Sequence, residues 1–261
     1  MKKRLISILL LCCMVLTLLP TTVLAADGPM DTIPKYDVSI DVYNRTSDIS
    51  IKDSRSYYIY SSVPDKLRDT WAWDKKIFIK GDKTAPHVFI DGVNIEMSPS
   101  SKGPAIELNK KASAYIYFIG KDSTLQGADG RAAIQKNRSE GQLYVLARTG
   151  TTVTCKGGYR AAGIGGSWAI RNIGDSMFNM DMYGHGVNMH FGSQSNPDYW
   201  GGTINATGGE YGAGIGAGSW GHSGHSGNTI HGGAGERLYF YSGTVNASGG
   251  RPAAGIGGGF R

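Results

Sequence analysis

Short runs in which apolar and polar residues alternate make up most of this chain. The segment 114–119 (AYIYFI) alternates in this way, and in 152–156 (TVTCK) valine and cysteine alternate with threonine and lysine. Alternation with a period of two, bounded by turn residues, predicts β-strands. Beyond the first 26 residues no segment keeps a helical period, so we expect an all-β protein.

Three glycine-rich segments repeat almost residue for residue. They are 151–168 (TTVTCKGGYRAAGIGGSW), 202–220 (GTINATGGEYGAGIGAGSW) and 243–260 (GTVNASGGRPAAGIGGGF). Weaker copies of the unit lie upstream, and the isoleucine that follows an alanine marks each copy. The markers are Ile106, Ile134, Ile164, Ile215 and Ile256, at spacings of 28, 30, 51 and 41 residues.

The shortest spacings decide the fold class. Propeller blades repeat at about 40–50 residues, whereas a unit of 28 or 30 residues with two or three short strands fits one solenoid coil. We therefore predict a right-handed parallel β-helix (β-solenoid) with glycine-rich coils. The two longer spacings predict loop insertions at about 169–199 and 221–236. The isoleucine of each Ala-Gly-Ile-Gly should point inward between corners that tolerate positive φ.

The N-terminus predicts export from the cell. Three basic residues at positions 2–4 precede an apolar run at 5–19 and small residues around 25–26, which is the order of a secretory signal peptide. This run is shorter than the about 20 apolar residues of a membrane-spanning helix. We expect cleavage after residues 1–26, no membrane span thereafter, and an extracellular or cell-surface location.

The rest of the chain divides into an N-terminal part and a repetitive part. Residues 27–75 should form N-terminal strands or a cap of the solenoid, and residues 76–261 the β-helix itself. Because the sequence stops directly after the last Ala-Gly-Ile-Gly unit, we expect it to be truncated at the C-terminus.

Composition narrows the class of protein. The 39 glycines lack the strict period of collagen, and 14 Tyr and 5 Trp argue against disorder. Without the leader, 24 basic residues face 21 acidic ones and are interspersed with them, so no nucleic-acid partner is expected. Cys155 is then the one cysteine left, so no internal disulfide can form and packing must stabilise the fold. We also expect the protein to be a monomer.

Several segments resemble one known group of proteins. The segments VFIDGVNIEM, PAIEL, AYIYFIGKDSTLQG and AAIQ, with the TVNASGG and AAGIGGG repeat, resemble the extracellular β-helix "carbohydrate-binding domain-containing" proteins of Gram-positive bacteria, whose shape is like that of pectate lyases. The resemblance extends from about Tyr36 to Arg261. It implies a bacterial surface protein that binds plant or host polysaccharide, and it leaves the need for Ca²⁺ open. This is a likeness of fold, and it does not by itself fix the chemistry.

Aromatic residues near the ends of the repeats are the candidate carbohydrate-binding residues. An aromatic ring offers a flat apolar face, and Tyr and Trp add a polar group at the edge. The candidates are Trp168, Trp200, Trp220, Tyr159, Tyr199 and Tyr211. Trp168 and Trp220 occupy nearly the same place in their repeats, so they are expected to form a ladder along one edge. The alternative is that these rings cover glycine corners.

Two further groups of residues are candidate metal ligands. Ca²⁺ is bound by several oxygen ligands, and Asp91, Asp122 and Asp129 can supply them. Asp91 and Asp122 are expected to be neighbours because Ile90 and Ile119 align in the repeat; a lyase would add Lys121 or Arg131 as the base. His222, His225 and His231 have a spacing compatible with zinc, or they lie in a solvated loop.

The function predicted from these residues is that of a secreted, noncatalytic carbohydrate-binding or adhesive protein. A polysaccharide lyase or glycoside-degrading β-helix enzyme is one alternative, and a structural surface stalk is another. A row of exposed aromatic rings would favour the first, a carboxylate cluster beside a base the second, and the absence of both the third.

Overall fold

The computed structural model describes residues 34–98, 103–109, 111–136, 140–171, 184–222 and 231–260, with the backbone alone for 169–171, 220–222 and 231–232. The predicted signal peptide, residues 1–26, lies outside the described residues. The described part contains one short 3-10 helix, η1 (Asp65–Leu67), and none of its helices has the length and apolar character of a membrane span.

Three parallel sheets make up the body of the protein. Sheet A contains β1 (Val38–Asp41), β3 (Ser56–Tyr60), β5 (His87–Asp91), β8 (Ala114–Ile119), β11 (Leu143–Ala147), β15 (Gly186–Phe191) and β20 (Gly235–Phe240). Sheet B contains β2 (Ile49–Ile51), β4 (Ile77–Lys80), β7 (Ile106–Asn109), β10 (Ile134–Gln135), β13 (Ile164–Gly165), β17 (Ile215–Gly216) and β22 (Ile256–Gly257). Sheet C contains β6 (Ile95–Glu96), β9 (Ser123–Gln126), β12 (Thr152–Lys156), β16 (Thr203–Thr207) and β21 (Thr244–Ser248).

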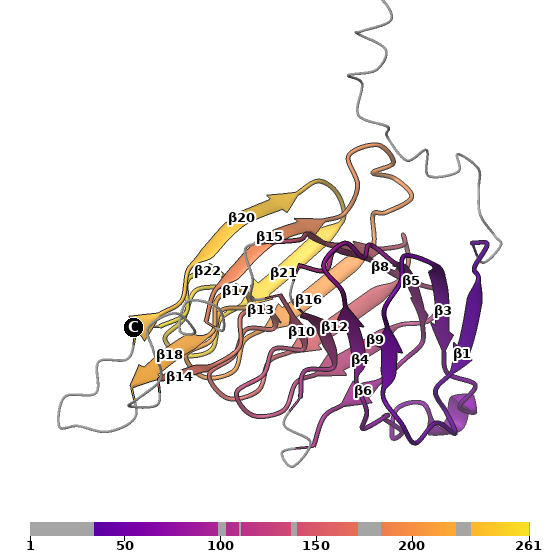
Figure 1. Ribbon diagram of the computed structural model, residues 1–261, viewed down its shortest axis with the longest axis horizontal. Helices are drawn as coiled ribbons and strands as arrows, with labels where there is room; N and C mark the ends of the chain where they lie inside the picture. Colours follow the sequence, from indigo (N-terminus) through magenta and orange to yellow (C-terminus); the bar gives the residue numbers. More distant parts are fainter. Residues whose placement is uncertain are drawn as a thin grey trace, which may run out of the picture. The chain divides into compact units, whose positions relative to one another are not determined.

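Each complete coil visits the sheets in the order A, C, B, and the next coil pairs with it in parallel. The chain colours in Figure 1 accordingly follow one another from β1 to β20 along the stack. The first coils contribute to sheets A and B before sheet C begins, and a single bridge from Trp73 to Ile95 precedes it. The predicted parallel β-helix is thus confirmed. Residues 27–75, expected as strands or a cap, are described from residue 34 onward and supply β1 to β3 of the sheets.

One column of isoleucines runs through sheet B. Successive strands pair in register through Ile49, Ile77, Ile106, Ile134, Ile164, Ile215 and Ile256. The predicted alignment of the five marker isoleucines is therefore confirmed. All but the last are at most 2% exposed, whereas Ile256 is 48% exposed. Stacked burial of this kind stabilises the fold by about 1.5–3 kcal/mol per side chain.

The glycine after each of the last three markers forms a second column. Gly165, Gly216 and Gly257 pair in register, with φ of +129°, +129° and +118°. This backbone conformation strongly favours glycine. A Cβ on Gly165 would also overlap the carbonyl oxygen of Gly216 in the next coil. In these three coils the backbone conformation therefore favours the last glycine of Ala-Gly-Ile-Gly, whereas Glu107 and Gln135 occupy the same column in the earlier coils.

The two predicted insertions differ from expectation in their extent. β15 lies inside the first predicted insertion, 169–199, yet it is the sheet A strand of its coil. The additional structure is a small sheet D, which contains β14 (Ala169–Arg171), β18 (Ser219–His222) and β19 (His231–Gly232). β14 pairs with β18, so the segments that follow two successive corners are joined. Spacing along the sequence carries no information on this pairing.

Candidate functional site

The outer face of sheet C carries hydrogen-bonding side chains in columns. One column contains Glu96, Gln126, Lys156, Thr207 and Ser248. A second contains Thr124, Thr154, Asn205 and Asn246, and the Asn246 amide donates a hydrogen bond to Asn205 Oδ1 at 2.9 Å. The alternate positions, such as Val153 and Cys155, are buried. Alternation along each strand thus places aliphatic groups inside and polar groups outside.

A segment that precedes β6 lies beside the outer face of sheet C and is held there by hydrogen bonds and an ion pair. We name residues 64–73, which include η1, the arm. Trp73 N donates to Asn94 O at 2.8 Å, and the Arg68 guanidinium donates to Gly92 O at 2.9 Å. Lys121 Nζ lies 2.8 Å from Asp65 Oδ1, and this ammonium group lowers the pKa of Asp65. The arm therefore forms a fixed wall along sheet C.

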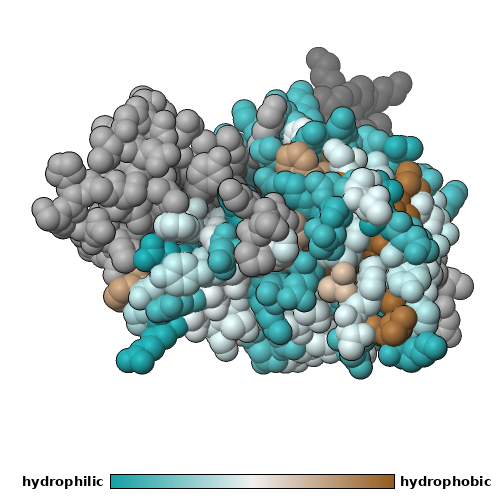
Figure 2. Space-filling view, turned by 90° about the horizontal axis from the view of Figure 1, so that it is seen from below, coloured by the Kyte–Doolittle hydropathy of each residue, from teal (hydrophilic) through white to brown (hydrophobic). Residues whose placement is uncertain are grey.

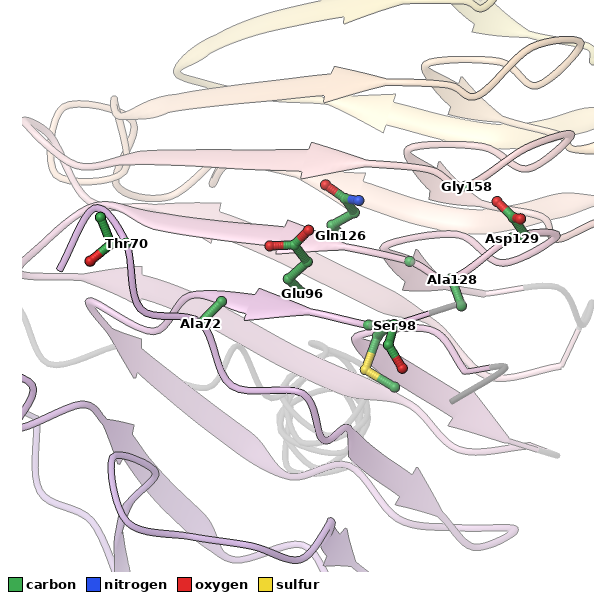
Figure 3. Close-up of a pocket in the computed structure, with 10 residues that line it drawn as sticks. Thr70, Ala72, Glu96, Ser98, Gln126, Ala128, Asp129 and Gly158 are labelled. Carbon is green, nitrogen blue, oxygen red and sulfur yellow. The ribbon is translucent and has the colours of Figure 1, made fainter. Parts of the chain in front are cut away.

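A polar trough lies between the arm and the strands. It consists of three hollows of about 500, 260 and 420 Å³, and the second shares lining residues with each of the other two. We name the whole the sheet C trough; its principal lining residues are Thr70, Ala72, Asn94, Glu96, Thr124, Gln126, Asp129 and Gly158. In Figure 3 the Glu96 and Gln126 side chains lie next to each other, with Asp129 and Gly158 toward one end.

An aromatic cluster begins where the trough ends. Tyr159 follows Gly158 directly, and its carbonyl accepts a hydrogen bond from Gly130 N at 2.9 Å. The Arg160 guanidinium lies over the rings of Tyr159, Trp168 and Tyr211, at 5.0, 5.1 and 5.6 Å from their centroids. We name these four residues the Arg160 corner. Tyr159 is 41% exposed and directly follows Gly158, which lines the trough.

Three predicted carbohydrate-binding residues therefore come together, whereas Trp200 and Tyr199 lie elsewhere. Tyr159, Trp168 and Tyr211 share the Arg160 corner, which no spacing along the sequence predicted. Trp200 is 7% exposed and packs among Tyr58, Phe89, Ile119 and Leu146, and Tyr199 packs at a right angle against it, 4.8 Å between centroids. The expectation that Trp200 offers a ring face to a ligand is wrong, because that face is buried.

The expected ladder of Trp168 and Trp220 is also wrong. The register pairs Trp220 with Ala169, one residue beyond Trp168. A shift of one residue turns side chains to opposite faces of a strand, so the two tryptophans do not share a column. The side chain of Trp220 lies outside the described residues.

The predicted calcium ligands do not converge either. Ile90 pairs with Phe118, and Asp91, not Ile90, pairs with Ile119. Asp91 Oδ1 accepts from Lys121 N at 2.8 Å, and Asp122 Oδ1 accepts from Thr152 N at 2.7 Å, so each carboxylate caps a turn in the next coil. Asp129 lines the trough with Glu96. Among the described residues no group of three or more His, Cys, Asp or Glu is placed to hold a metal.

The histidine cluster falls largely outside the described part of the chain. His222 and His231 lie on β18 and β19, and the backbone alone is described for them. His225 lies outside the described residues. The zinc hypothesis for these three histidines stays a prediction.

Sequence reasoning missed an aromatic ladder on the outer face of sheet A. His87, Tyr115, Tyr144, His190 and Tyr239 stack in one column, with centroids 4.7, 4.4, 4.4 and 4.7 Å apart. The same alternation that predicted the strands would have shown aromatic residues at the outward positions. Because each internal ring stacks on both faces, the ladder offers ring edges rather than faces to solvent. We therefore assign it to stability.

This ladder makes stability depend on pH between about 7 and 5. Burial lowers the pKa of both His87 and His190, so below the ordinary histidine pKa of about 6.5 the unfolded chain binds more protons than the folded one. Stability is then lost as the pH falls from about 6.5 through the lowered folded-state pKa. We expect the midpoint of thermal unfolding to fall from pH 7 to pH 5.

The control is a double variant, His87→Phe with His190→Phe, which keeps stackable rings and removes both titrations. Its thermal midpoint should change less between pH 7 and pH 5 than that of the natural chain. An equal pH dependence in the two proteins would show that these histidines are not its source.

One face of the protein is shown by hydropathy in Figure 2. Hydrophilic residues predominate on this face, and hydrophobic residues gather in small separate patches. Scattered apolar residues are normal for a protein surface and need no partner.

Comparison with known proteins does not assign this chain to a family. No family model, no curated protein and no solved structure matches this chain.

Proposed function

We propose that this protein is a secreted, noncatalytic carbohydrate-binding protein and that the sheet C trough is its binding site. The observation that carries the proposal is that a polar trough on a parallel sheet includes Gly158, and that the next residue, Tyr159, is an exposed aromatic residue. Sugar rings present hydroxyl groups around their edge and C–H groups on their faces. A site for them needs hydrogen-bonding side chains and an apolar ring face in one place.

The floor of the trough supplies the hydrogen bonds. Thr124 and Gln126 stand on β9, and Glu96 belongs to the neighbouring strand β6. The Asn94 side chain accepts a hydrogen bond from Thr124 N and donates one to Arg68 O, so it ties the arm to the sheet. The amide of Gln126 and the hydroxyl of Thr124 can both donate and accept, as sugar hydroxyls do. β9 is paired on both sides, and β6, at the edge of sheet C, is bridged to Trp73 of the arm. The backbone below these side chains is therefore held in place before a ligand binds, which limits the entropy lost on binding.

The contacts of the acidic residues support binding over lyase chemistry. A lyase would need Asp91 and Asp122 together beside a free Lys121 or Arg131. Asp91 and Asp122 instead accept backbone hydrogen bonds, and the Lys121 ammonium pairs with Asp65 on the arm. These groups already have structural partners.

The test is a pull-down of the chain with cellulose, pectin and mucin-type polysaccharides, with and without EDTA, followed by titration with the best ligand. Tyr159→Ala and Gln126→Ala should each weaken binding by about tenfold or more, which corresponds to about 1.4 kcal/mol. The matched controls are Tyr36→Ala, which removes a ring that is 40% exposed elsewhere, and Ser248→Ala, in the Gln126 column but outside the trough.

Assay of the supernatant separates the remaining functions. Unsaturated or reducing-end products would replace the proposal with an enzyme, and loss of binding in EDTA would show that a cation is required. Absence of binding to every polysaccharide would favour the structural stalk.

A further inference from the structure

Arg160 occupies a backbone position that suits glycine. It has φ of +64°, while the residues at the same corner of the neighbouring coils, Gly130 and Tyr211, have +73° and +69°. Hydrogen bonds from Gly130 N to Tyr159 O and from Arg160 N to Glu210 O establish this equivalence. A side chain at positive φ costs about 1 kcal/mol or more. Gly130 shows that glycine makes the turn, so the arginine side chain is not needed for it.

The Arg160 side chain has unused hydrogen-bonding capacity. Within the described part of the chain its guanidinium makes no hydrogen bond and no ion pair, and its Nε is buried without a partner. Trp168 Nε1 and Ser219 Oγ are also buried and unpartnered, and Ser219 N donates to Arg160 O at 2.9 Å. Leaving such a group unpaired costs about 1–3 kcal/mol. Two donors and a hydroxyl without partners thus occupy one corner.

Glu210, whose backbone carbonyl accepts the hydrogen bond from Arg160 N, interacts through its carboxylate with the Tyr211 hydroxyl, and this interaction raises the pKa of Tyr211. The rings of Tyr159, Trp168 and Tyr211 hold the guanidinium by cation–π contacts. The corner is therefore a positioned cation at the end of the trough.

We propose that the Arg160 corner binds an anionic substituent, a carboxylate or a sulfate, of a glycan lying in the sheet C trough. The inference rests on the proposed function and names the class of glycan. A guanidinium binds such oxyanions through two parallel hydrogen bonds. The anion compensates the positive charge held among the rings, and the strained backbone at Arg160 is retained for this contact.

The experiment compares neutral, carboxylated and sulfated forms of one soluble β-glucan by titration calorimetry. The natural chain should bind a charged form about tenfold or more tightly than the neutral form. Arg160→Gly should reduce this preference, measured as the ratio of the two affinities, to less than about threefold, while its thermal midpoint stays equal or rises because the strain is relieved. Arg160→Lys should keep part of the preference, since the charge remains and the paired hydrogen bonds are lost.

Arg237→Gly is the matched control, because Arg237 is an exposed arginine with φ of +53° on β20. It removes the same charge and should leave the preference intact. Carboxylated and sulfated forms are compared with each other to identify the anion.

Each adverse result has a distinct meaning. Equal binding of neutral and charged forms would overturn this inference and keep the proposed function, and binding of no form would overturn both. A thermal midpoint several degrees lower in Arg160→Gly would show that the side chain serves the fold, and would also overturn the inference. An equal loss in Arg237→Gly would mean that net charge alone causes the preference.

Discussion

Replacing Gly165 with alanine is expected to lower the free energy of unfolding by about 2–5 kcal/mol. Positive φ costs a non-glycine residue about 1–2 kcal/mol, and Gly165 has φ of +129°. Its Cβ would also overlap the carbonyl oxygen of Gly216 and approach the side chain of Met189, and such overpacking adds about 1–3 kcal/mol. Urea denaturation followed by circular dichroism measures the loss.

Gly257→Ala is the matched control for this variant. Gly257 belongs to the same column and has φ of +118°, but nothing lies within 4 Å of a Cβ built on it. Its substitution should cost only the backbone strain, about 1–2 kcal/mol. If the two variants lose equal stability, the contact between coils is not what demands glycine in this column.

Ile164→Ala is expected to cost about 2–5 kcal/mol, the usual range for removing a large aliphatic side chain from a core. Ile164 is 0% exposed and pairs with Ile134 and Ile215 on its two sides. The cavity would open between coils whose backbones are held by the strand ladders, so little collapse can relieve it. The same denaturation measurement applies.

Ile256→Ala supplies the comparison within one column. Ile256 is 48% exposed and pairs with Ile215 on one side, so we expect a cost below about 1 kcal/mol. Comparable losses at Ile164 and Ile256 would contradict the view that stacking between successive coils provides the stability of this column.

The trough depends on the same alternation that builds the core. On β9 and β12 the inward residues Leu125, Val153 and Cys155 are 0% exposed, and the residues between them face the trough or the surface next to it. Burial raises the pKa of the Cys155 thiol, so this cysteine serves as a small apolar core residue. The stability of the coil and the chemistry of its surface therefore belong to alternate positions of the same strands.

Local patterns in the sequence determined the class of fold and which isoleucines align in successive coils. Period-two alternation specified the strands, and the recurring Ala-Gly-Ile-Gly specified which isoleucines stack. Both follow from local constraints: alternation selects the buried face, and a positive φ selects glycine. The inward isoleucines and the glycine corners could therefore be assigned to their roles without a structure.

Tertiary structure alone decided where the side chains of different coils meet. An error of one residue in the expected register was enough to align Ile90 with Ile119 and Trp168 with Trp220, because a shift of one residue reverses the face. The arm is held against sheet C by contacts between residues far apart in sequence, such as that of Lys121 with Asp65. Contacts of this kind leave no local pattern in the sequence. Tyr159, Trp168 and Tyr211 likewise meet only because coils stack at a corner; composition suggested the ring types, and packing around Arg160 brought them together.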